Sequence, residues 1–103
     1  MKKIINGMRF DTEKAIEVGN YCTPISKSDF NYCDVSLYKT PRSGRFFLAG
    51  EGGPMTRFGK NWGDGTRGFG EKTILMSTEQ ALEWAEQYLD AEEIEAHFDI
   101  EEA

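Results

Sequence analysis

The fold is decided by residues 35–49, which read VSLYKTPRSGRFFLA. Val35 and Leu37 share one side of an extended strand because side chains alternate with a period of two, and Phe46 and Leu48 do the same in the second half. The PRSG segment between the two halves supplies turn residues. We therefore predict an antiparallel hairpin at the centre of a small sheet.

A second hairpin is predicted at the N-terminus. Asn6-Gly7 is a preferred pair for a two-residue type I′ turn, because both central positions need a positive φ. Its short arms are residues 3–5 and 8–10.

The segment between the two hairpins predicts one helix and one irregular stretch. Asp11 or Thr12 can cap a helix, so we expect a short N-terminal helix over residues 13–18. Residues 20–34 read as irregular because Pro, Ser and Asp punctuate them.

The C-terminal quarter predicts one more strand, over residues 71–76, followed by two helices. Ser77 with Gln80 forms a capping-box pattern, and Asp90 with Glu93 repeats it. The apolar positions of the first helix form one stripe at helical spacing: Ala81, Leu82, Ala85, Tyr88 and Leu89.

The composition fits one folded domain over residues 1–103. Hydrophobic residues make up 39% and aromatic residues 13%, enough for a core without disulfides or metal. The predicted fold class is α+β: a small antiparallel sheet of two hairpins plus one strand, with a short N-terminal helix and two acidic C-terminal helices.

A glycine-rich loop is expected over residues 50–70, which hold eight of the eleven glycines. Residues 63–68 match the dinucleotide pattern G-x-G-x-x-G, but no strand leads in and no helix leads out. Residues 53–60 resemble a P-loop, but the spacing is one residue too long and Asn61 replaces the magnesium-binding Ser or Thr. We reject both phosphate motifs.

The same loop interleaves basic and aromatic residues, a pattern that suits single-stranded nucleic acid. The set is Arg57, Phe58, Lys60, Trp62, Arg67 and Phe69. The overall acidity of the chain disfavours a nucleic-acid partner, because such binding needs a dominant basic face. We favour rings that fold back onto the sheet, in a loop that could still meet a protein.

Charge is distributed unevenly along the chain, whose net charge is -6. Residues 1–76 carry 12 basic and 8 acidic side chains, whereas residues 77–103 carry ten acids and no Lys or Arg. Like charges one turn apart weaken a helix, so a sequence that keeps them gains something from the field they create. This pattern predicts an acidic interaction surface.

Residues for catalysis or for holding a cofactor are not recognisable in the sequence. His97 is the one histidine and has no second metal-binding residue at ligand spacing or triad partner around it. Cys22 and Cys33 are expected as free thiols, and no apolar run is long enough to cross a bilayer. We expect a cytoplasmic protein that is not an enzyme and needs no cofactor or metal.

Several segments together resemble small acidic proteins of bacteriophages and other bacterial mobile elements, a group that includes anti-CRISPR proteins. The segments are residues 2–7, 10–15, 37–40, 50–56 and 83–91. The resemblance spans most of the chain and carries over no catalytic residue. It implies a bacterial host cell and a CRISPR effector complex as the protein partner.

The sequence thus predicts an anti-CRISPR inhibitor that binds an effector stoichiometrically and blocks its nucleic-acid binding, as a DNA mimic or by covering a recognition surface. The predicted contact residues are Glu83, Glu86, Asp90, Glu92, Glu93 and Glu95, with Arg57, Phe58 and Trp62 as a second surface. Two alternatives stay open: a mobile-element regulatory module that binds another host protein, and a small nucleic-acid-binding module that uses the glycine-rich loop. Neither a membrane partner nor a nucleic-acid partner is favoured, and the expected state is a monomer or weak homodimer.

Overall fold

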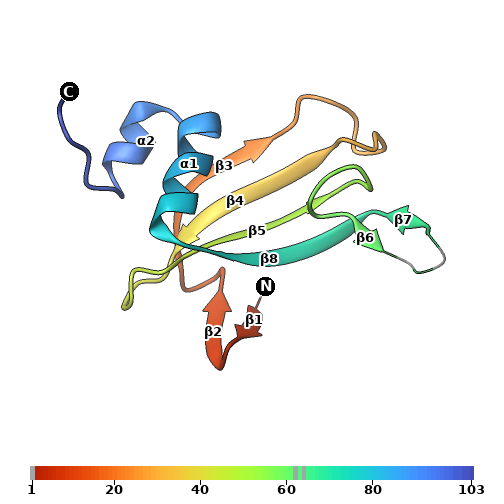
Figure 1. Cartoon of the computed structure of the whole chain (residues 1–103), viewed down its shortest axis with the longest axis horizontal. Helices are drawn as coiled ribbons and strands as arrows, with labels where there is room; N and C mark the ends of the chain where they lie inside the picture. The colour runs from red at the N-terminus through yellow and green to blue at the C-terminus, as the bar shows by residue number, and fades with distance from the viewer. Residues whose placement is uncertain (1, 62, 64) are drawn as a thin grey trace.

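The computed structural model describes residues 2–61, 63 and 65–103, and it is mostly β (Figure 1). Strands account for 40% of the described residues and helices for 16%. The main sheet has four antiparallel strands in the order β3-β4-β5-β8. Its strands are β3 (Ile16–Cys22), β4 (Cys33–Lys39), β5 (Phe46–Gly52) and β8 (Gly70–Met76).

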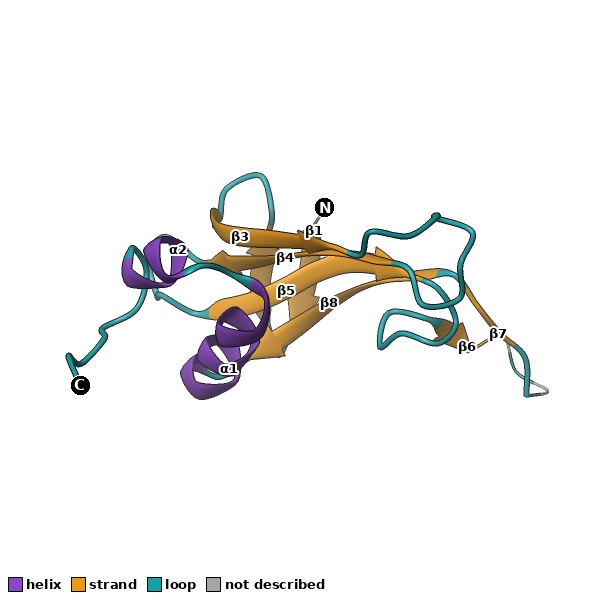
Figure 2. Ribbon diagram, turned by 90° about the horizontal axis from the view of Figure 1, so that it is seen from above, coloured by secondary structure: helices purple, strands orange, loops and turns teal. Residues whose placement is uncertain are grey.

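Two small two-stranded sheets and two helices complete the fold. The N-terminal hairpin pairs β1 (Lys2–Ile5) with β2 (Met8–Asp11), and the glycine-rich region pairs β6 (Lys60–Asn61) with β7 (Arg67–Gly68). The helices are α1 (Thr78–Tyr88) and α2 (Ala91–Glu95). Figure 2 shows the helices at one end of the main sheet and the β6–β7 pair at the other.

The central hairpin is confirmed as β4 and β5. Leu37 pairs with Leu48, and each is 0% exposed. The alternation along β5 fills two cores. Leu48 points to the face covered by the helices, whereas its neighbour Phe47 points to the face covered by the β1–β2 hairpin.

The two cores differ in size. Among the described residues, the helix-side core holds ten that are buried: Val18, Val35, Leu37, Phe46, Leu48, Phe58, Met76, Ala81, Trp84 and Ala85. The hairpin-side core holds three: Phe10, Phe47 and Ala49. The sheet therefore has a thickly covered face and a thinly covered one.

The N-terminal hairpin is confirmed at the predicted turn. Asn6 has φ 53° and Gly7 has φ 77°, as a type I′ turn requires. The hairpin folds onto the sheet because Phe10, 1% exposed, meets the Phe47 ring edge-on with 5.3 Å between ring centres.

The predicted N-terminal helix over residues 13–18 is wrong. A turn forms there, in which Lys14 and Ala15 both donate their amides to the Asp11 carbonyl, and strand β3 begins at Ile16. Val18 is buried at 5% exposure in the helix-side core. Pairing with the central strand and burial of a β-branched residue outweigh the weak helix preference of six residues.

The predicted α+β class with three helices is therefore also wrong, because the chain is mostly β with two short helices. The single small sheet of the prediction is replaced by three sheets. Residues 20–34, which were predicted to be irregular, contribute the end of β3 and the start of β4. Residues 50–70, which were predicted to be a glycine-rich loop, contribute the end of β5, β6, β7 and the start of β8.

Both C-terminal capping boxes are confirmed. Ser77 caps α1 with Gln80, and Asp90 caps α2 with Glu93. The predicted apolar stripe of α1 is only partly buried: Ala81 and Ala85 are buried, Leu82 and Leu89 are half-buried, and Tyr88 is 41% exposed. Trp84, which the prediction left out, is buried at 7% exposure.

Candidate functional site

The C-terminal acids of α1 lie on its outer side. Ala81, Trp84 and Ala85 face the sheet, so Glu83 and Glu86 point away from it and are exposed. The last turn of α1 carries no basic residue, so the negative end of the helix dipole is uncompensated.

The acids of α2 divide into two kinds. Asp90 accepts the Glu93 amide at Oδ1 (2.9 Å), and Glu93 accepts the Asp90 amide at Oε1 (3.2 Å), so both hold the helix start. Glu93 is also half-buried beside Gly19, where an added Cβ would lie 3.1 Å from its carboxylate. Glu92 and Glu95 are exposed and have no such role. We call Glu83, Glu86, Asp90, Glu92, Glu93 and Glu95 the acidic face.

Within the described residues, the acidic face makes no ion pair. The ion pair in that part of the chain joins Lys27 Nζ to Glu51 Oε1 at 3.6 Å, at the end of the sheet away from the helices. Lys39 reaches under α2, where its Nζ donates to the His97 carbonyl at 3.5 Å, and it lines a cavity of 240 Å³ with Glu95. The acidic face thus presents carboxylates to solvent with little compensation from the body of the protein.

The glycine-rich loop is held by one of its own cations. Arg67 donates from Nε to the Pro54 carbonyl (2.9 Å) and from Nη2 to the carbonyls of Thr56 (3.4 Å) and Gly59 (3.5 Å). Its guanidinium is therefore occupied by the loop. A site that bound nucleic acid through this residue would first have to release it.

The second predicted surface is only partly at the surface. Arg57 is exposed, Phe58 is 2% exposed in the helix-side core, and Trp62 lies outside the described residues. The burial of Phe58 agrees with the expectation that the aromatic rings of this loop fold back onto the sheet. A buried ring cannot stack on a nucleic-acid base. The nucleic-acid interpretation of the loop loses one of its stacking residues.

Arg57 and Phe58 line a groove of 350 Å³ beside α1 that the sequence did not suggest. Its aromatic wall joins Tyr21 to Tyr88, with ring centres 4.5 Å apart, and Tyr88 to Trp84, with centres 5.1 Å apart. The sequence offered one signal for this aromatic wall: Trp84 and Tyr88 are four residues apart, which places both rings on the same face of a helix. The contribution of Tyr21 comes from β3, which the sequence did not predict.

Two groups at the β3–β4 end have altered proton affinity. The contact between Tyr32 Oη and Cys22 Sγ (3.8 Å), followed by burial, raises the pKa of Tyr32 to about 12. Burial, followed by the charges of Cys22 and Asp34, raises the pKa of the Cys33 thiol. Both cysteines are free, and they point to opposite faces because Cys22 pairs with Asp34, the neighbour of Cys33.

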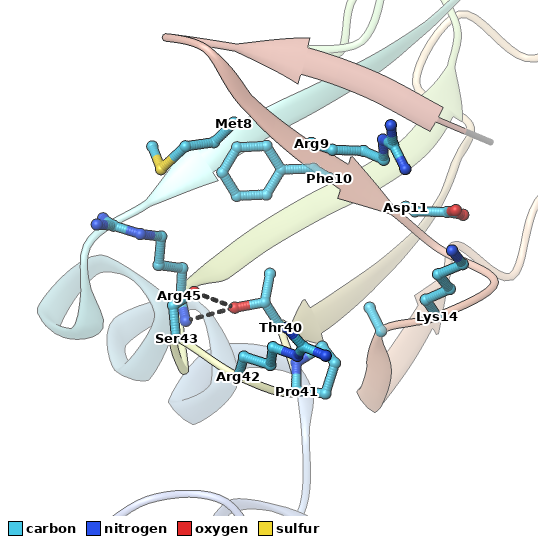
Figure 3. Close-up of a pocket in the computed structure, with 11 residues that line it drawn as sticks. Met8, Arg9, Phe10, Asp11, Lys14, Thr40, Pro41, Arg42, Ser43 and Arg45 are labelled. Atoms are coloured by element: carbon cyan, nitrogen blue, oxygen red, sulfur yellow. Dashed lines mark hydrogen bonds between the residues drawn. The ribbon is translucent and has the colours of Figure 1, made fainter.

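A larger pocket, of 560 Å³, opens on the hairpin side (Figure 3). It lies between β2 with its following turn and the turn that joins β4 to β5. Four cations line it: Arg9, Lys14, Arg42 and Arg45. We call these four residues and their surroundings the basic pocket. No sequence pattern pointed to it, because its cations come from three separate segments that only the fold brings together.

Two further properties follow from the part of the chain that the structure describes. No group of three or more His, Cys, Asp or Glu side chains there is placed to hold a metal ion. Neither of its helices has the length and apolar character to cross a membrane.

Comparisons with known proteins gave no relative: no protein-family model, curated protein or solved structure matches this chain significantly.

Proposed function

We propose that the protein is an inhibitor that binds its partner directly, docking the acidic face on a cationic surface of a CRISPR effector complex. The supporting observation is that exposed carboxylates gather on α1 and α2 without an ion pair in the described residues. Basic channels that hold nucleic acid are the complementary surface, since effector complexes track the nucleic-acid backbone with cations. The choice of effector among basic partners comes from the sequence resemblance.

The geometry assigns different tasks to the six acids. Glu83, Glu86, Glu92 and Glu95 are exposed and are the proposed contact residues. Asp90 and Glu93 hold the start of α2, so they position the others. Contacts of this kind raise the association rate through long-range attraction, and the ones fully desolvated by the partner slow dissociation.

The test compares two variants with equal net charge. One replaces Glu83, Glu92 and Glu95 with Gln; the other replaces the exposed body acids Glu13, Glu17 and Glu71 with Gln. Neither touches a capping box, so helix content measured by circular dichroism should stay as in the parent protein.

Purified effector complexes of several CRISPR types are titrated with each protein while binding of target DNA is followed by gel mobility. We expect one type to be inhibited near equimolar ratio, with inhibition weakened at least tenfold by the acidic-face variant, unchanged by the body variant, and reduced by added salt. Equal inhibition by both variants would refute the acidic face as the contact.

The partner class is tested separately by the range of effectors. If every effector type binds its DNA unimpeded, the CRISPR assignment is wrong. Salt-sensitive binding of another host protein, lost in the same acidic-face variant, would then identify a mobile-element regulatory module.

A further inference from the structure

The basic pocket lies between a turn whose backbone is fixed by hydrogen bonds and a floor of packed apolar side chains. Thr40 Oγ1 accepts the Arg45 amide at 2.9 Å and shares a hydrogen bond with Ser43 Oγ at 2.8 Å. Gly44, at φ 64°, closes this turn. Arg42 and Arg45 therefore leave the sheet from a backbone whose path is fixed, which lowers the entropy lost when they bind a ligand.

The floor of the pocket is apolar. Phe10 is packed on Phe47 and faces the turn across the pocket, as Figure 3 shows, with Met8 beside it. Ala15 and Pro41 add further apolar lining. A ligand that fits here needs an organic body as well as a charge, because small-molecule sites combine apolar walls with a few polar anchors.

The rim of the pocket is cationic and unpaired. Arg9, Lys14, Arg42 and Arg45 are exposed, and in the described residues their side chains make no ion pair or hydrogen bond. The one carboxylate in the lining, Asp11, is 9% exposed and accepts the Glu13 amide at 3.0 Å. Four cations against one carboxylate give the pocket a positive potential within a protein of net charge -6.

We propose that the basic pocket binds a phosphorylated small molecule of the size of a mononucleotide. Three of the four cations are arginines, whose planar fork matches phosphate oxygens in pairs. The phosphate lies on the rim and the organic body rests on Met8, Pro41 and the edge of the floor. This site is independent of the acidic face and of the function proposed for it.

Charge decides between a nucleotide and a nucleic-acid strand. The helices that carry the acidic face pack on the opposite side of the main sheet from the β1–β2 hairpin, and residues 77–103 carry ten acids. A long strand extends past the screening length of roughly 8 Å at physiological salt and meets this negative field. A small phosphate ester stays inside the pocket, where the four cations are the dominant charges.

The experiment follows backbone amide shifts of the full chain by NMR during titration with adenosine monophosphate. We expect saturable shifts in residues 8–15 and 40–45. A variant with Lys14→Gln and Arg42→Gln should bind at least tenfold more weakly. The matched control replaces Lys27 and Arg57, exposed cations outside this pocket, with Gln and should bind as the parent does.

Three ligands separate the parts of the proposal. Adenosine should leave the pocket amides unshifted, because it lacks the phosphate, and inorganic phosphate should bind more weakly than the nucleotide, because it lacks the organic body. Adenosine binding as well as the nucleotide, or full affinity in the Lys14/Arg42 variant, would overturn the phosphate site. Equal affinity for inorganic phosphate and for the nucleotide would refute the claim that the organic body contributes to binding. Tighter binding of a single-stranded DNA oligomer would refute the claim that the ligand is a small molecule.

Discussion

The two faces of the central sheet show how one alternating strand can serve two opposite purposes. β5 sends Phe46 and Leu48 into the large helix-side core, and Phe47 and Ala49 into the small hairpin-side core. The helices α1 and α2 cover the helix-side core, and their outer surface carries the acidic face. The β1–β2 hairpin covers the hairpin-side core only in part, and the basic pocket with its cations opens beside it. Charge is thus segregated by the sheet, although no single strand encodes the segregation.

The largest effect is expected from removing one core residue on each face. Phe47→Ala should lower the free energy of unfolding by about 3–5 kcal/mol and Leu48→Ala by about 2–5 kcal/mol, because both side chains are 0% exposed. Urea unfolding of the two variants measures the loss. Hydrogen exchange should show that Phe47→Ala exposes the amides of β1 and β2 first, whereas Leu48→Ala exposes those of α1. Identical exchange patterns would contradict two separate cores.

A smaller effect is expected from removing the N-cap of α1, the helix that carries Glu83 and Glu86. Ser77→Ala should cost about 1 kcal/mol of stability, because it removes the acceptor of the Gln80 amide. Thr78→Ala is the matched control, since this neighbouring hydroxyl has no capping role in α1. Thermal unfolding compares the two, and an equal loss in both variants would show that the cap contributes nothing specific.

The acidic face itself should act against stability. Glu83 lies four residues from Glu79 and three from Glu86, so Glu83→Gln should raise the free energy of unfolding by about 0.3–0.5 kcal/mol at low salt. The gain should disappear in high salt because exposed charges are screened. Glu13→Gln, outside any helix, should change little in the same denaturant titrations. A destabilised Glu83 variant would mean that this carboxylate has a partner inside the protein.

The smallest effect concerns pH, at Tyr32 just before the start of β4. The fold raises the pKa of Tyr32 to about 12, above its ordinary value of about 10, so it favours the neutral phenol. The resulting stability is complete below pH of about 10 and is lost as the pH rises through about 12. The contact with Cys22 is the main cause of the raised value, so Cys22→Ala should lower the pKa of Tyr32.

Titration of phenolate absorbance measures this shift, with Tyr32→Phe assigning the signal. An unchanged Tyr32 pKa in the Cys22→Ala variant would show that burial alone is responsible.

Sequence patterns succeeded where the decisive forces are local. The Asn6-Gly7 turn and both capping boxes depend on contacts a few residues apart, and the central hairpin joins two strands through one short turn; each was predicted correctly. Prediction failed at residues 13–18, where a weak local preference for helix competes with pairing to a strand that lies about twenty residues further along.

For the candidate sites, the sequence identified the acids but not their different tasks. The number of these acids and the absence of Lys and Arg from residues 77–103 are evident in the amino-acid sequence. The division into exposed contact residues and the Asp90–Glu93 pair that holds α2 appears only with the hydrogen bonds. Phe58 was assigned to a contact surface and lies in the core, because the loop that carries it folds back under Arg67.

The sequence by itself determined the charge of the C-terminal segment, the turns, the caps and the central hairpin, since each depends on residue types that are near one another in the chain. Only the tertiary structure decided that β3 extends the sheet, that Tyr21 meets Tyr88, and that cations from residues 9–45 line one pocket. The physical reason is that these contacts join segments far apart in the chain, and the free energy that selects them comes from burying both faces of the sheet at once.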